Sequence, residues 1–349
     1  MPAFYTHYIF GRFGYHDMEE GALKEMVRRH KKVYSFGLSG PDIFFYFAPD
    51  QLLVHPTPGS RLHEEKCGAF LRCMLREALA LSGEERAVAV SYLAGFIGHY
   101  ALDVSCHPHV YEYIEEEAAF LERGEGGRVS DGSMHFRIRR RPRAHRVSRH
   151  EKTGIHFRYE CAMDHYFLEY YASKRAGQLR QRKMVYLAPK ERKVIARLVA
   201  AAYNKTYDRP HMSEASMRAV LFCVRMVQHL ICDPYGRKEK ILCPLEKFVY
   251  RHPFLAGLFV NDNCYSIGKE EWEKMDELFR IGRREYKAMS DALGEVIASA
   301  WMLSETGASF GKETKNTAAI RQARIRYERA LKLFADALGS RSYHTGMPV

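Results

Sequence analysis

Apolar residues recur every three to four positions along most of this 349-residue chain, and this period constrains the fold more than any other feature. The spacing places apolar side chains on one face of a helix, whereas a half-buried strand alternates with a period of two. No stretch alternates in that way for long, so the sequence predicts an all-α protein. Ser82-Gly-Glu-Glu85 resembles a capping box, and Pro189 and Ser213 stand where helices are expected to begin. The predicted helices are residues 19–34, 64–81, 84–106, 110–123, 153–174, 190–207, 213–231, 269–302 and 315–338.

Other stretches interrupt this pattern. Residues 124–152 and 232–268 contain the turn-forming residues that are typical of irregular structure. Gly307 to Thr314 is expected to link the last two helices. The tail from Gly339 onward is expected to be frayed, because chain ends are poorly ordered unless they are tied down.

The chain is basic, with 54 lysine and arginine residues against 42 aspartate and glutamate residues, a formal net charge of +12. Such a surface attracts anionic partners, including phosphate esters, nucleic acids and acidic membranes. The irregular stretch 124–152 is expected to be an exposed loop. It is either a surface that faces phosphate or nucleic acid, or a solvated insertion. After its glycines come seven arginines: Arg137, Arg139, Arg140, Arg141, Arg143, Arg146 and Arg149.

The sequence shows no secretory signal pattern, and its eight cysteines form no CxxC pair. Scattered cysteines without a signal are typical of reduced thiols in a cytoplasmic protein. The most apolar stretch, Ala87 to Leu102, is interrupted by His99 and is too short to cross a bilayer. We therefore expect a cytoplasmic protein without a transmembrane segment.

One segment concentrates possible metal ligands. His99 and Asp103 are four residues apart, so on a helix they share a face, and His107 extends that face by a turn. Pro108 predicts that the helix ends at His107, which leaves His109 free to turn back toward the same point. Imidazole and carboxylate groups together suit zinc. The alternative is a pair of core histidines and a helix end that favours histidine, but an unpartnered buried Asp103 would then be costly.

A second pair has the same helical spacing. His156 and Glu160 are four residues apart, and Asp164 follows four residues later. Asp164 is expected to lie outside the ligand set and to hold the ligands in position. A near copy, His165 with Glu169, begins nine residues after His156, which is half a turn out of phase on a helix. Only one of the two pairs can therefore enter a given site. Either pair alone also fits an ordinary exposed ion pair.

Three further candidates lie near the start of the chain. His7 stands in an aromatic-rich segment, and Asp42 is followed directly by Ile-Phe-Phe-Tyr, an unusual setting for a surface acid. The alternative for Asp42 is the N-cap of a short helix. His63 and His55 are the histidines that follow it, and His63 lies just before a predicted helix.

Together these motifs resemble the zinc-dependent phospholipase C family, which is distantly related to fungal single-strand nucleases. His7, Asp42 and His63 also occur along the chain in the order in which the family has its first histidine, its aspartate and its second histidine. The likeness covers about the first half of the chain. The residues that carry it most strongly are His99, Tyr100, Asp103, Val104 and His109 in one motif, and His156, Glu160 and Asp164 in the other.

The resemblance implies a hydrolase that uses two or three zinc ions to activate water against a phosphodiester, such as that of a phospholipid, with Asp42 as the general base. It also implies a metal-binding helical core over 1–175. Residues 176–349 carry no assignable motif and are expected to form a further helical half that packs on this core. The implied ligands are Asp42, His63, His99 and Asp103 for one ion; His109 or His107 with His156 and Glu160 for a second; and His7 with Asp103 for a third.

Two other functions remain open at this point. A nuclease on the same fold would use the arginine-rich stretch and would bind nucleic acid with a steep salt dependence. A non-catalytic helical protein would hold its metal in a closed shell of four ligands.

Overall fold

The computed structural model describes residues 4–47, 56–124, 146–175, 178–179, 186–209, 211–233, 235–242, 259, 267–305 and 318–349. Over these residues the structure is helical and has no β-strand, which confirms the all-α prediction. In chain order the elements are α1 (Phe4–Asp17), α2 (Ala22–Arg29), α3 (Lys31–Gly37), the 3-10 helix η1 (Gly40–Tyr46), α5 (Pro58–Glu64), α6 (Cys67–Ala80), α7 (Gly83–Glu122), α8 (Arg149–Ala172), α10 (Pro189–Thr206), α11 (Glu214–Ile231), α13 (Lys269–Glu305) and α14 (Ala318–Leu338).

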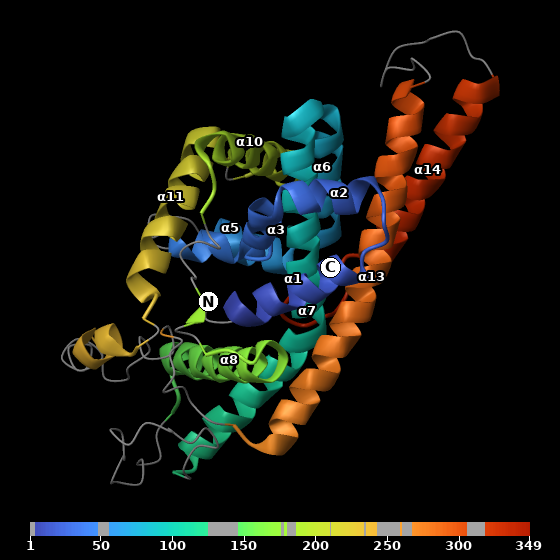
Figure 1. Ribbon diagram of the computed structural model, residues 1–349. Helices are drawn as coiled ribbons and strands as arrows, with labels where there is room; N and C mark the ends of the chain where they lie inside the picture. The colour runs from blue at the N-terminus through green and yellow to red at the C-terminus, as the bar shows by residue number, and fades with distance from the viewer. Residues whose placement is uncertain are drawn as a thin grey trace.

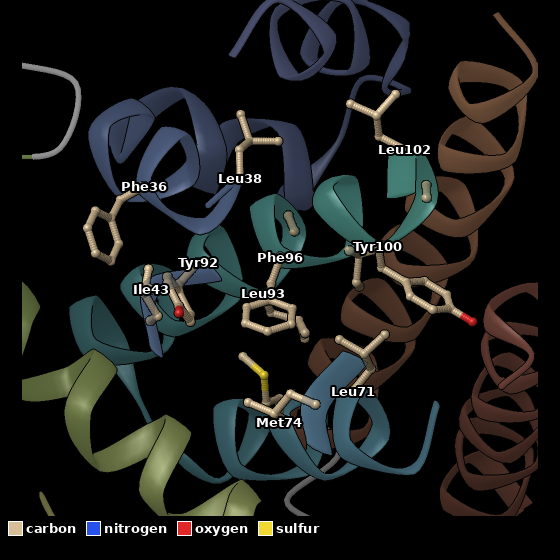
Figure 2. Packing of buried hydrophobic residues seen from close by; sticks show 14 of the residues in the cluster. Phe36, Leu38, Ile43, Leu71, Met74, Tyr92, Leu93, Phe96, Tyr100 and Leu102 are labelled. Carbon is tan, nitrogen blue, oxygen red and sulfur yellow. The ribbon is translucent and has the colours of Figure 1, made fainter. Parts of the chain in front are cut away.

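Helix α7 is the central element, and α1, α2, α3, α6, α8, α10 and α13 all pack against it (Figure 1). By length and composition it could cross a membrane, but its most apolar window is completely buried inside the protein. Figure 2 shows Leu93 and Phe96 of α7 facing Leu71 and Met74 of α6. The apolarity of α7 is therefore explained by its place in the core.

The predicted end of this helix at His107 is wrong, because α7 continues through Pro108 to Glu122. The predicted helices 84–106 and 110–123 are thus one. A proline inside a helix loses one backbone hydrogen bond and costs about 3 kcal/mol. Residues on both sides of Pro108 are buried, among them Val104 and Val110, and this packing offsets the loss. At the other end Ser82 is the N-cap, but its side chain makes no capping hydrogen bond.

One other predicted helix is broken in the structure, because the stretch 19–34 divides into α2 and α3 at His30. The predicted helix 64–81 corresponds to α6, whereas α5, which ends at Glu64, was not predicted. Between α5 and α6, Lys66 has a left-handed backbone with φ of 50°. Helix α1 was not predicted, because its apolar and aromatic residues do not gather on one face. It packs against α8, α7 and α13, so its burial rather than its periodicity stabilises it.

The prediction of a frayed tail is also wrong. Residues 339–349, which we call the C-terminal hook, fold back beside α7 (Figure 1). Ser342 N donates to Met347 O and Val349 N donates to Ser340 O, and these bonds close the hook. Tyr343 N donates to His63 O, and the Tyr343 side chain is buried. The C-terminal hook is thus bonded to α5, although the two segments lie far apart in the sequence.

One hydrophobic core extends from Tyr5 in α1 to Tyr343 in the C-terminal hook. Helices α13 and α14 lie side by side, and α13 also runs along α7 (Figure 1). Tyr286 of α13 donates to Ala94 O of α7 and also shares a hydrogen bond with Tyr34 of α3. The later helices therefore help to position the central helix, and the division at residue 175 stays a prediction.

Candidate metal centre

Four of the sequence-predicted residues converge in one buried group, which we call the first group: Asp42 of η1, His63 of α5, and His99 and Asp103 of α7. One ligand atom from each lies within 4.8 Å of the others. Asp42 Oδ1 lies 3.1 Å from His63 Nε2 and 3.8 Å from His99 Nε2. His99 Nε2 lies 2.9 Å from Asp103 Oδ2. The helical spacing of His99 and Asp103 thus places both on the face predicted.

A glycine allows η1 to approach α7. Gly40 has φ of +48°, a conformation that L side chains rarely adopt. A Cβ on Gly40 would lie 2.2 Å from Cδ2 of His99, so a side chain there would collide with the imidazole. Asp42 follows two residues later within η1, whose N-cap is Ser39. The alternative role of Asp42 as an N-cap is therefore wrong, and its carboxylate faces His63.

The backbone orients both imidazoles of the first group. His63 Nδ1 lies 2.7 Å from Gly59 O, and His99 Nδ1 lies 3.0 Å from Leu38 O. A carbonyl oxygen only accepts, so each Nδ1 carries a proton, and in a neutral ring Nε2 holds a lone pair. Those lone pairs face carboxylate oxygens in a buried space. A cation resolves this repulsion, and metal-bound histidines commonly have such an outer partner on the second nitrogen.

Three more predicted residues form the second group: His107 of α7, and His156 and Glu160 of α8. Glu160 Oε1 lies 2.9 Å from His156 Nε2 and 3.4 Å from His107 Nε2. A capping box of Ser148 with Glu151 begins α8 and sets its first turn. The side chain of His156 is 14% exposed, so this group lies nearer to solvent than the first.

The charges within this centre shift the pKa values in opposite directions. Burial lowers the pKa of His107, but Asp103 and Glu160 outweigh it and raise the value to about 9. Burial raises the pKa of Glu160, but His156 and His107 leave it well below its usual range. The pKa of Asp103 is likewise held low by His107 and His99 against the effect of burial. Without a metal, the carboxylates are therefore ionised beside a protonated His107.

Asp103 joins the two groups. Its Oδ1 lies 3.6 Å from His107 Nε2 and 3.3 Å from His7 Nε2, while its Oδ2 faces His99. The ring of His7 stacks on that of His99 with centroids 4.2 Å apart. Three predicted histidines thus surround one carboxylate.

Asp164 fixes the helix that carries His7. Its carboxylate accepts from Tyr5 N at 3.1 Å and from both N and Oγ1 of Thr6 at 2.7 Å. The first N–H groups of a helix lack partners within the helix, so Asp164 of α8 serves as a remote cap for α1. Burial raises the pKa of Asp164, although the hydrogen bonds from Thr6 and Tyr5 oppose this effect.

Some predicted residues lie elsewhere. His109 Nε2 lies 2.7 Å from Glu271 of α13, outside both groups, because the uninterrupted helix directs it away from His107. His165 lies 3.7 Å from the exposed Glu169, as expected for the out-of-phase pair. His55 falls outside the described residues. So does most of the arginine-rich stretch, of which Arg146 and Arg149 are described and exposed.

His344 was not predicted from the sequence, although it lies close to both groups. Its ring stacks on His63 with centroids 5.1 Å apart and lies 6.2 Å from His107 and 5.1 Å from Tyr111. Burial, followed by the nearby His63 and His107, lowers the pKa of His344 to about 2. No motif marks this residue, and the only signal is an aromatic and a histidine side by side in a tail otherwise rich in small residues.

A small pocket, partly open to solvent, lies next to the first group. Two predicted site residues, His7 and Asp42, are in its wall, so the pocket gives access to the centre. Aromatic and small polar side chains supply most of the rest. The lining residues are Phe4, His7, Tyr8, Ser35, Leu38, Ser39, Asp42, Tyr46 and Gln228.

The fold and the donor set define a class: an all-α protein in which buried imidazoles and carboxylates converge from four helical elements, as in zinc centres. The sequence profile of the zinc-dependent phospholipase C family matches residues 6–216, and the chain belongs to this family. Searches of curated proteins and of solved structures find no match. The matched region contains both groups, and the C-terminal hook lies outside it.

Proposed function

We propose that the protein is a zinc-dependent hydrolase that cleaves the phosphodiester of a phospholipid. The observation that carries this proposal is the junction at Asp103, where two adjacent ligand groups meet beside a pocket. Membership of the zinc-dependent phospholipase C family supports the metal and the substrate class.

The residues present fit zinc. The first group offers two imidazole nitrogens and two carboxylates, and the second offers two imidazoles and one carboxylate. Each is a donor set that zinc prefers. His7 and Asp103 would hold a third ion, so we propose two or three per chain. When bound, paired zinc ions neutralise phosphate oxygens and lower the pKa of a coordinated water.

The protein's own groups would orient and deprotonate the nucleophile. Asp42 belongs to the first group and also lines the pocket, so its carboxylate meets a substrate that enters there. We assign Asp42 as the general base that accepts the proton of the attacking water. His63 Nε2, 3.1 Å from Oδ1, holds that carboxylate in place. The water oxygen bonds to phosphorus as the ester P–O bond breaks, and the leaving alcohol takes up a proton.

The pocket and the surface charge favour an anionic, partly apolar substrate. Phe4, Tyr8 and Tyr46 present rings beside the polar groups of the wall. This combination suits a molecule with a charged phosphate next to an apolar part. The net charge of +12 would raise the local concentration of such a substrate at low ionic strength.

The first experiment is the metal content of protein purified without chelator, by plasma mass spectrometry, followed by hydrolysis assays on bis(p-nitrophenyl) phosphate and on phosphatidylcholine vesicles. We expect two or three zinc ions per chain and chelator-sensitive release of product. Zinc without hydrolysis of either substrate would instead support the non-catalytic alternative.

A matched pair of variants makes the test specific. His156→Ala removes a predicted ligand, and His165→Ala removes a histidine nine residues later on the same helix that pairs with Glu169. We expect loss of zinc and of hydrolysis in the first variant and wild-type values in the second. Equal behaviour of the two variants would contradict the assignment.

A further inference from the structure

Helix α11, at the periphery of the molecule, carries a row of exposed apolar side chains (Figure 1). Phe222, Met226 and Leu230 are four residues apart, so they share one side of the helix, and they are 55%, 52% and 58% exposed. Single exposed apolar side chains are ordinary, whereas a contiguous row of large ones marks a contact site. We call these three residues, together with the exposed Arg218 and Arg225, the outer face of α11.

The other side of the same helix belongs to the core and to the pocket. Val220 and Val224 are buried, and α11 packs on α10 and η1. Gln228 lines the pocket, and its amide donates to the Tyr46 hydroxyl of η1 at 3.2 Å. Gln228 is two residues from Met226, which is about 200° around the helix. Since a helix is roughly 10–12 Å across, whatever covers the outer face lies about one helix diameter from the pocket wall.

The charge of the outer face is positive. Arg218 and Arg225 lie beside the apolar row, and from Ala215 to Ile231 the helix contains no aspartate or glutamate. Its one acidic residue is Glu214, in the first turn. A helical face with large apolar side chains and basic residues fits the boundary between lipid headgroups and acyl chains, and its charge favours anionic lipids.

Two arginine–tyrosine pairs border the apolar row. The Arg225 guanidinium lies 5.4 Å from the centre of the Tyr186 ring, and that of Arg237 lies 5.7 Å from the centre of the Tyr235 ring. Both tyrosines are exposed. Lys238 Nζ donates to backbone carbonyls at the C-terminal end of α11 and so holds the following segment against the helix. Tyrosine and arginine each combine an apolar body with a polar tip, which suits the headgroup region of a membrane.

These charges disfavour the other occupants of such a face. A two-fold dimer would set two positive faces against each other, because the same patch contributes from both copies. A nucleic acid would satisfy the arginines but would leave the apolar row uncovered. An anionic bilayer satisfies both features.

We infer that the outer face of α11 is a membrane-binding surface that docks the protein on a bilayer containing anionic phospholipid. The face begins at Arg218, beyond residues 6–216, which the family profile matches. The inference rests on the proposed function, because docking there would place the bilayer beside the pocket that receives the substrate. The binding step itself requires neither zinc nor hydrolysis.

The test is flotation of the full chain, as purified, with vesicles of phosphatidylcholine that contain phosphatidylserine. Phe222→Glu with Leu230→Glu changes the outer face, and Ile325→Glu with Leu333→Glu is the matched control, since these α14 residues are 59% and 51% exposed. We expect the first pair to weaken binding at least tenfold, because a charge replaces apolar surface, and the control pair to bind as wild type does. Equal affinities of the two double variants, or a wild type that does not bind, would overturn the inference.

The arginines test the choice of an anionic bilayer. Arg218→Gln with Arg225→Gln should weaken binding to vesicles with phosphatidylserine by roughly fivefold for each arginine, and should leave binding to phosphatidylcholine alone unchanged. An equal loss on both kinds of vesicle would contradict that choice. A dimer that Phe222→Glu with Leu230→Glu dissociates, in a protein that ignores vesicles, would identify a second copy as the occupant and overturn the inference.

Insertion into the bilayer is measured separately with Phe222→Trp, which keeps the apolar row. Its emission should shift to shorter wavelength on addition of vesicles, beyond any shift from Trp272 and Trp301 in wild type. The absence of an added shift would contradict insertion of this face. Vesicle binding without hydrolysis of any phosphodiester would refute the proposed function. Hydrolysis of bis(p-nitrophenyl) phosphate by a protein that ignores vesicles would refute only this inference.

Discussion

The two ligand groups differ in how they are built. The first group has four donors, from η1, α5 and α7, and its most exposed member is Asp42 at 4%. The second group has three donors from α7 and α8, and one of them, His156, reaches solvent. Zinc sites with four protein ligands are typically structural, and sites with three keep a position for water or substrate.

This difference indicates a division of roles. The first group joins η1 and α5 to the central helix and contributes Asp42, the proposed general base, to the pocket wall. The second lies at the more exposed end and has one donor fewer, which would leave a position for water or substrate on a bound zinc ion. Asp103 belongs to the first group and contacts His107 of the second, so it couples them. The following predictions would break or sharpen this comparison.

The largest effect is expected at Asp103. Asp103→Asn keeps the shape of the side chain but removes the charge shared by both groups. We expect zinc to be lost from both groups, a larger effect than the roughly 10–100-fold cost of losing an outer partner. Metal content by mass spectrometry tests this. If one ion remained tightly bound, Asp103 would serve a single group and the proposed coupling would be wrong.

The next effect separates His107 from His109. His107→Ala should abolish binding at the second group and leave the first group occupied, because only His107 faces Glu160. His109→Ala should keep full zinc content, because His109 contacts Glu271 of α13. Isothermal titration with Zn²⁺ measures both. The reverse result would mean that the register of the sequence motif, rather than the helix through Pro108, determines the ligand.

A smaller effect is expected at Asp164, which contacts neither group directly. Asp164→Ala removes the cap of α1 and frees the segment that positions His7. We expect zinc affinity to fall by roughly 10–100-fold, which is typical when a residue that supports a metal ligand is removed. The loss of the helix cap should also lower the melting temperature of the metal-free protein. Chelator competition and thermal denaturation test this. Normal affinity would show that His7 does not depend on the cap.

The effect that needs no substitution, and is smallest within one pH unit, is a pH dependence at the second group. The pKa of His107 is raised to about 9 in the metal-free protein, so the ion pairs that it makes are complete below pH 6.5 and lost as pH rises through 9. Zinc must displace this proton. Affinity at the second group should therefore rise up to about tenfold per pH unit between pH 7 and 9. A zinc titration at several pH values tests this, and a flat profile would contradict it.

Much of the centre followed from spacing along helices. His99 with Asp103 and His156 with Glu160 are each four residues apart, and this separation places two donors on one face in any helix. The same geometry predicted that His165 lies on the side of the helix opposite to His156. Such pairs were predictable because the helix itself fixes their relative positions.

Features that depend on packing between distant segments were not predictable in this way. Pro108 suggested the end of a helix, but burial on both sides keeps α7 continuous, and this brings His107 to Glu160 and His109 to Glu271. Helix α1 lacked a clear periodic face and forms because α7, α8 and α13 surround it. Local patterns do not include these long-range contacts.

By itself the sequence determined the all-α class, the family and the paired ligands of α7 and α8, because helical periodicity and short motifs are local properties. Only the tertiary structure decided that the two groups meet at Asp103, that Asp164 caps α1, and that His344 reaches the centre. The physical reason is that these contacts join residues far apart in the chain. Their formation depends on the burial and hydrogen bonds of the whole fold, which no local spacing encodes.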